Sequence, residues 1–151
     1  MSFADSHVGT LFDVLGAARL FWDIRAMRRD YKSILGALKP GLDRDDAMQA
    51  FVDASWSVLG PTGVSWIGFY IKSDDETMTL GPRRDKPACS PIGLHGACGR
   101  AWVTRTPLVV CDVAELGENY IACDPRDRSE VVIPLFEESG ECWGVLDVGQ
   151  P

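Results

Sequence analysis

The sequence predicts a single α+β domain in which an antiparallel sheet of about six strands is flanked by helices. Before residue 60, apolar residues recur at helical spacing, and from residue 64 the period changes to two. Gly, Pro and acidic clusters then separate short β-rich runs, as in a series of hairpins. With 151 residues, of which 46% are hydrophobic, the chain can build one domain core but not two comfortable ones.

Composition excludes several classes of function. The net charge is −7 and no basic stripe is present, which argues against binding to nucleic acid. No apolar run reaches the roughly 18 residues that a membrane span needs, and the N-terminus lacks the layout of a signal peptide. We therefore expect a cytoplasmic protein, in which thiols stay reduced. The five cysteines are an odd number, so they cannot all form disulfides with one another.

Two helical segments come first. An apolar stripe runs through residues 7–38 and ends at a Lys-Pro-Gly turn. Its length fits either packing on the same domain or contact with a second copy in a homodimer. Asp43 then predicts the N-cap of an amphipathic helix that ends before Gly60, and Asp45 and Asp46 would complement its dipole.

The remaining elements are predicted to be strands around an irregular segment. Residues 64–72 are apolar on both faces, which is typical of a central strand. A partner strand at residues 77–80 should end at Gly81-Pro82, and residues 83–96 should be irregular up to a helix from about Ala97. Further strands are predicted at residues 107–113, 130–136 and 142–148, with Pro134 at an edge or bulge.

Thiol chemistry is the function that the segment of residues 86–130 suggests, because it holds four of the five cysteines. Cys98 lies where a glycine-bearing loop enters the helix, and free backbone N–H groups there favour a thiolate. Cys123 lies in a loop beside an acidic residue, and Glu130 begins a strand from which it could donate a proton. Cys111 and Cys142 lie in apolar strands and are expected to be buried packing residues.

Two alternatives stay open from the residues alone. Trp66 and Tyr70 share a strand face, where they are either ordinary core or an aromatic wall for a small ligand. Cys89, Cys98 and Cys123 could in principle hold zinc, but no C-x-x-C spacing supports it, and we expect neither a metal nor a bound cofactor.

A series of motifs in order then carries a resemblance: GFY, LGP, KPAC, GACG, VCDV, YIACD, SEVVIPL and GVLDV. Together they resemble the free methionine-(R)-sulfoxide reductases, which are single GAF-domain enzymes acting on the free amino acid. The resemblance covers about residues 31–148 and leaves out the first thirty. It implies a GAF-like fold with an extra N-terminal helical segment.

The resemblance also implies roles for the cysteines. Cys123 of IACD matches the nucleophile, which would attack the sulfoxide sulfur, release methionine and become a sulfenic acid. Cys89 of KPAC matches the resolving cysteine, and Cys98 of GACG matches a third thiol of the disulfide relay. Thioredoxin is the implied reductant of this antioxidant reaction.

The other implied site residues are an acid and a pocket lining. Glu130 matches the acidic residue that protonates or polarises the sulfoxide oxygen. Trp66 and Tyr70 match aromatic residues of the pocket, and Asp147 matches the first carboxylate of the closing strand.

One departure from the family pattern concerns the closing strand. The family ends in LDxD, whereas this chain reads LDVGQP, so Gly149 replaces the second carboxylate. Losing a charge-assisted contact of this kind costs about 1.5–3 kcal/mol. The alternative function is therefore a GAF-type module that binds or senses a small ligand with weak or lost reductase activity. If Gly149 only impairs the enzyme, Gly149→Asp is expected to raise activity.

Overall fold

The computed structural model describes residues 29–119 and 127–151. The chain divides into two compact units, Met1–Asp30 and Tyr31–Pro151, and the helices and strands set out here belong to the second. Residues 7–28 of the predicted N-terminal stripe therefore lie outside the described residues. The end of the stripe forms helix α2, Tyr31–Ala37. Within the described ranges, no helix has both the length and the apolar character that crossing a membrane requires.

Helix α3, Arg44–Leu59, begins and ends as the sequence predicts. The backbone N–H of Asp46 donates a hydrogen bond of 2.8 Å to the Asp43 carboxylate, which satisfies one of the free donors at the helix start. The buried side of α3 repeats at helical spacing and consists of Met48, Val52, Ser55 and Leu59. The chain then tightens into a short 3-10 helix, Gly60–Thr62, before the first strand.

Removing this cap gives a first testable prediction. Asp43→Ala is expected to lower the free energy of unfolding by about 1 kcal/mol, because the Asp46 N–H loses its partner. Urea denaturation of the full chain measures the change. Asp45→Ala is the matched control. It also removes one negative charge near the helix start but breaks no capping hydrogen bond, so it should lower the free energy of unfolding by only about 0.3–0.5 kcal/mol. Equal losses in the two variants would contradict the assignment of the cap.

Six strands of the described chain form one antiparallel sheet in the order β3-β2-β1-β6-β5-β4. This confirms the predicted α+β class and the central position of the strand that is apolar on both faces. The strands are β1 Trp66–Lys72, β2 Thr77–Arg84, β3 Ile92–Gly93, β4 Leu108–Val110, β5 Ser129–Phe136 and β6 Cys142–Gln150.

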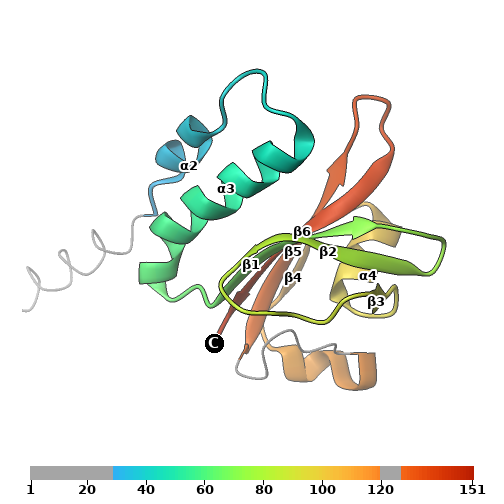
Figure 1. Cartoon of the computed structure of the whole chain (residues 1–151). Coiled ribbons are helices and arrows are strands. Elements are labelled where there is room, and N and C mark those ends of the chain that lie inside the picture. The colour runs from blue at the N-terminus through green and yellow to red at the C-terminus, as the bar shows by residue number, and fades with distance from the viewer. Residues whose placement is uncertain (1–28, 120–126) are drawn as a thin grey trace, which may run out of the picture. The chain divides into compact units, whose positions relative to one another are not determined.

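The two faces of β1 pack against different helices (Figure 1). Ile67 and Phe69 pack with α2 and α3, and the cluster includes Ile34, Met48, Val52 and Leu59. Trp66 and Tyr70 point to the other face and pack with helix α4, Ala97–Thr104. Alternation along one strand thus divides the core into two layers, and the sheet separates α2 and α3 from α4.

The prediction that Gly81-Pro82 ends the second strand is wrong. β2 continues to Arg84, and its pairing with β1 shifts register where Gly68 and Tyr70 of β1 face Arg83 and Leu80. The extra residue of β2 falls at Gly81-Pro82, so these residues form a bulge. β3 pairs only with Thr77 and Met78, which leaves the outer edge of β2 free at Pro82, where a missing N–H costs no ladder bond.

The fourth strand is also shorter than predicted. β4 ends at Val110, and the 3-10 helix η2 spans Val113–Asn119. Cys111 follows β4 in a bend and is exposed, so the expectation that it is buried is wrong. Pairing of β4 with β5 stops at Val110, so the alternation of buried and exposed residues along the strand ends there. Cys142, in contrast, is buried as predicted.

Helix α4 begins directly after Gly96, whose backbone is extended, as the glycine-bearing loop predicts. Its position is fixed by a close backbone approach: a Cβ added to Gly99 would lie 2.1 Å from the carbonyl oxygen of Leu94. The loop before α4 therefore packs on the helix itself. This approach holds Cys98, in the first turn, against the sheet.

Candidate active site

One face of the sheet gathers the predicted site residues from three neighbouring strands. Residues directly paired across antiparallel strands point to the same face. The relevant pairs are Trp66–Gly149, Gly68–Asp147 and Tyr70–Val145 between β1 and β6, and Glu130–Gly149 and Val132–Asp147 between β5 and β6. This register brings Trp66, Asp147 and Glu130 to the face that α4 covers, with Gly149 between Trp66 and Glu130.

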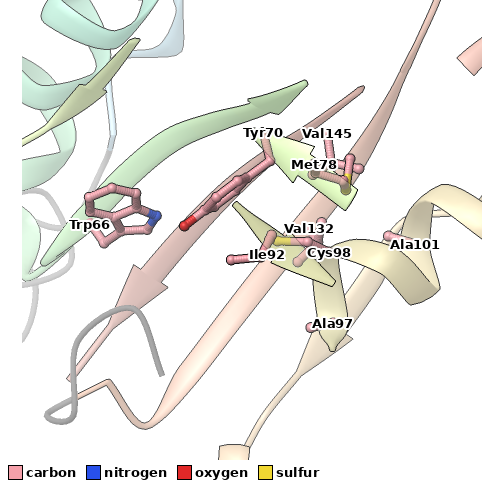
Figure 2. Close-up of a cluster of buried hydrophobic side chains, with 9 residues drawn as sticks. All are labelled: Trp66, Tyr70, Met78, Ile92, Ala97, Cys98, Ala101, Val132 and Val145. Carbon is pink, nitrogen blue, oxygen red and sulfur yellow. The ribbon is translucent and has the colours of Figure 1, made fainter. Parts of the chain in front are cut away.

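The two aromatic residues lie next to each other on this face. Trp66 is 2% exposed and Tyr70 is fully buried, and Figure 2 shows the hydroxyl end of the Tyr70 ring pointing toward the Trp66 indole, with Cys98 on the other side of Tyr70. Gly68 lies between them, and a Cβ there would lie 2.6 Å from Cζ2 of Trp66, so the indole extends over the glycine. Both residues are thus core, and Trp66 also turns its polar edge toward the carboxylates described next.

Glu130 is poised to give up a proton near neutral pH. Burial, and secondly the negative charge of Asp127, raises the pKa of Glu130 from 4.5 to about 7. A carboxyl group with a pKa in this range is half protonated at pH 7, which is the condition for efficient general acid catalysis in a neutral cell. The Glu130 side chain is only partly buried, so it can exchange protons with solvent.

Asp147 is the deeper carboxyl group of the site. Burial, and secondly the charge of Glu130, raises its pKa well above the usual range. The Trp66 indole and the Cys98 thiol lie against this carboxyl group and offset part of the rise. Asp147 therefore links the strand residues to α4.

Three buried polar atoms of this face complete no hydrogen bond of normal geometry within the described part of the chain, although Trp66 and Asp147 lie against each other. They are Nε1 of Trp66, Oδ1 of Asp147 and Oε1 of Glu130. Trp66 and Asp147 are each only 2% exposed, so these atoms are also withdrawn from water. Leaving such groups unpaired costs about 1–3 kcal/mol each, and a polar ligand would satisfy them.

The cysteines fall into different environments. Cys98 is 6% exposed, lies in the apolar cluster of this face and faces Asp147. Cys89 is exposed, and its carbonyl oxygen accepts a 3.1 Å hydrogen bond from the Tyr70 hydroxyl, which ties its loop to the same cluster. Cys89, Cys111 and Cys142 are free thiols. Cys123, the predicted nucleophile, lies outside the described residues.

Comparison with known proteins places this fold in a family. The sequence profile of the GAF domain matches residues 41–151. The chain belongs to the GAF domain family. The resemblance noted in the sequence to free methionine-(R)-sulfoxide reductases is supported by the similar proteins described next.

Relatives of this GAF domain include named reductases. The free methionine-R-sulfoxide reductase of Saccharomyces cerevisiae is 38% identical over 88 residues, which are 56% of this chain and 48% of the yeast protein. Protein YtsP of Bacillus subtilis is 34% identical over 127 residues, covering 82% of this chain and 77% of YtsP. The matches to the yeast and Escherichia coli reductases span about half the length of those proteins.

A solved structure shows the same likeness in three dimensions. The free methionine-R-sulfoxide reductase of Neisseria meningitidis, in complex with its substrate, superposes on this GAF domain with a TM-score of 0.68. The two are 31% identical, and the superposition covers 78% of this chain and 68% of the Neisseria chain.

Sequence reasoning missed one residue of the GAF domain site. Asp127 is 8% exposed, accepts a hydrogen bond from the Ser65 hydroxyl and contributes to the raised pKa of Glu130. It lies in a segment predicted to be a polar loop, where an acidic residue attracts no attention. The sequence signal for Asp127 was indirect: position 149 lacks the carboxylate that the family pattern has there.

A separate open cavity lies at the opposite end of β1. Its volume is about 510 Å³, and none of the predicted site residues lines it. The lining residues are Arg44, Ile71, Lys72, Asp75, Trp102, Val103, Arg105, Glu141, Cys142 and Trp143. Two of its cations stack on tryptophan rings, Arg44 on Trp143 and Lys72 on Trp102.

Proposed function

We propose that this GAF domain reduces free L-methionine-(R)-sulfoxide to methionine by cysteine chemistry. The observation that carries the proposal is Glu130, a carboxyl group with a pKa of about 7 on a buried face that also holds Trp66, Asp147 and a thiol. Reduction of a sulfoxide needs a proton donor, because its oxygen leaves the substrate. The similarity to named reductases over the same residues supports this choice of substrate.

The reaction begins with Cys123 as the nucleophile. Its thiolate attacks the sulfoxide sulfur while Glu130 protonates the oxygen. The oxygen then transfers to Cys123, methionine leaves, and the cysteine becomes a sulfenic acid. The substrate sulfur is thereby reduced by two electrons, and the cysteine sulfur is oxidised by two.

A second thiol completes the cycle. Cys98 or Cys89 attacks the Cys123 sulfenic acid, forms a disulfide and releases the oxygen as water. A dithiol such as thioredoxin then reduces the disulfide by exchange and is itself oxidised to a disulfide. The overall balance is one sulfoxide and two thiols giving methionine, one disulfide and water.

The chemistry of this face suits a small zwitterion. The negative charge of Asp127 offers a partner for an ammonium group, and the Trp66 ring beside it is apolar, as the methyl and methylene groups next to the substrate sulfur require. The indole N–H lies against the Asp147 carboxyl group but completes no hydrogen bond of normal geometry among the described residues, so it is a candidate donor for a substrate oxygen.

A coupled assay tests the proposal. The full chain is mixed with thioredoxin, thioredoxin reductase and NADPH, and NADPH oxidation is followed with free L-methionine-(R)-sulfoxide, with the S epimer and with a peptide-bound sulfoxide. We expect turnover of the free R epimer alone. Cys123→Ser should abolish it, whereas Cys111→Ser, which changes an exposed thiol beyond β4, should retain it.

A different result would favour the binding module. No turnover of the R epimer above the Cys123→Ser background, together with a melting temperature raised by methionine or its sulfoxide, would show that the site binds without reacting.

A further inference from the structure

The space beside Gly149 is occupied by a carboxylate from another element. A Cβ added to Gly149 would lie 2.6 Å from Oδ2 of Asp127 and 3.1 Å from its Cγ. The same Cβ would be 3.4 Å from Cβ of Trp66. Any side chain at position 149 would therefore need the room that the Asp127 carboxylate fills.

Asp127 is held at this place by neighbours on both sides. The Ser65 hydroxyl donates a hydrogen bond to Oδ1 of Asp127, and Ser65 is itself fixed to β6 by its backbone N–H, which donates to the Gly149 carbonyl oxygen at 3.0 Å. The next residue, Arg128, donates its N–H to the Gln150 carbonyl oxygen at 2.8 Å. The position of the carboxylate is thus set by the start of β5 and the end of β6.

We propose that Asp127 supplies the second carboxylate of this site, relocated from position 149 to the start of β5, and that Gly149 is required to make room for it. The inference rests on the proposed function for its role in catalysis. Together with Glu130 and Asp147, Asp127 completes a set of three carboxyl groups on the sheet face that carries Trp66. Nε1 of Trp66 and Oδ1 of Asp147 are buried but complete no hydrogen bond of normal geometry within the described chain, which indicates that this set faces a ligand.

In the proposed reaction, Asp127 acts through Glu130. Its negative charge favours the protonated form of Glu130, which is the form that gives a proton to the sulfoxide oxygen. The other ionisable groups that face the set are Asp147 on β6 and the Cys98 thiol on α4. Gly149 then marks a rearranged site and not a lost one, which reverses the expectation that Gly149→Asp raises activity.

Exchange of the two positions tests the proposal. Asp127→Asn keeps an acceptor for the Ser65 hydroxyl but removes the charge, and it should lower kcat/KM about 10- to 100-fold. Gly149→Asp alone should also lower kcat/KM, because two carboxylates then compete for one space. The double variant Asp127→Ser with Gly149→Asp should recover much of the wild-type value. Ser65→Ala, which removes the hydrogen bond but keeps the carboxylate, should cost less than Asp127→Asn.

A second measurement decides the question without turnover. The side-chain carboxyl 13C shift of Glu130, followed by NMR against pH in the folded full chain, reports its titration. Asp127→Asn should move the Glu130 midpoint to lower pH, and the double variant should return it toward the wild-type value. If the Asp127 carboxylate did not act on Glu130, this midpoint would be unchanged in Asp127→Asn.

The outcomes separate the two proposals. A wild-type chain that does not reduce the sulfoxide would overturn the proposed function, while the NMR titration would still decide whether Asp127 belongs to the site. An unmoved Glu130 midpoint in Asp127→Asn, or higher activity in Gly149→Asp with Asp127 in place, would overturn the relocation. Thermal melts of every variant identify those that do not fold, and the isosteric Asp127→Asn is the variant expected to keep the fold.

Discussion

Glu130→Gln is expected to lower kcat for the free R sulfoxide about 100- to 10,000-fold, which is the usual contribution of a positioned general acid. Glutamine has nearly the same shape as glutamic acid but cannot give up a proton at neutral pH. The wild-type rate should decline as pH rises through about 7, because that is where Glu130 loses its proton. The residual activity of the variant should lack this decline. Steady-state kinetics between pH 5.5 and about 8.5 measures both effects.

A matched control and a stability measurement accompany this prediction. Glu138→Gln changes the same residue type in the exposed turn between β5 and β6 and should leave kcat unchanged. The folded protein keeps the Glu130 proton up to about pH 7, whereas the unfolded chain releases it near 4.5. Stability should therefore fall as pH rises across this window, and fall less in Glu130→Gln. A variant with wild-type kcat would exclude Glu130 as the acid.

Gly99→Ala is expected to lower the free energy of unfolding by about 3 kcal/mol or more, which is the upper end of the usual cost of overpacking a core. The added Cβ would lie 2.1 Å from the carbonyl oxygen of Leu94 and 2.3 Å from its carbonyl carbon, and these backbone atoms cannot rotate away as a side chain could. The loop before α4 must therefore move from the helix, and Cys98 would move from the sheet. Guanidinium denaturation measures the loss, and activity should fall with it.

Gly36→Ala provides the comparison for this substitution. Gly36 lies in α2, and a Cβ there would meet nothing within 4 Å. Alanine is favoured over glycine in a helix by roughly 0.5–1 kcal/mol, so this variant should be slightly more stable than wild type. A similar loss in both variants would show that the contact with Leu94 is not the cause.

The periodicity of the chain was sufficient to predict much of the fold. Alternation of apolar residues in β1 predicted a central strand, and the structure has it with a helix layer on each face. The Asp43 cap and the entry of α4 after Gly96 were predicted because local backbone chemistry decides where helices begin. The ends of the strands were harder to predict from the sequence. Gly81-Pro82 is a stop signal by composition, but the unpaired outer edge of β2 allowed a bulge there instead.

Only the tertiary structure could show which side chains share a space. The sequence by itself determined the residue types for thiol and acid chemistry and, by motif order, their resemblance to a reductase family. From the sequence alone, Gly149 indicated a lost carboxylate. The carboxylate that we propose takes its place, that of Asp127, lies 22 positions earlier in a loop-like stretch. Pairing of β5 with β6 brings Asp127 over Gly149, and burial on that face raises the pKa of Glu130. Both effects depend on distance through space and on exclusion of water, which adjacency along the chain does not record.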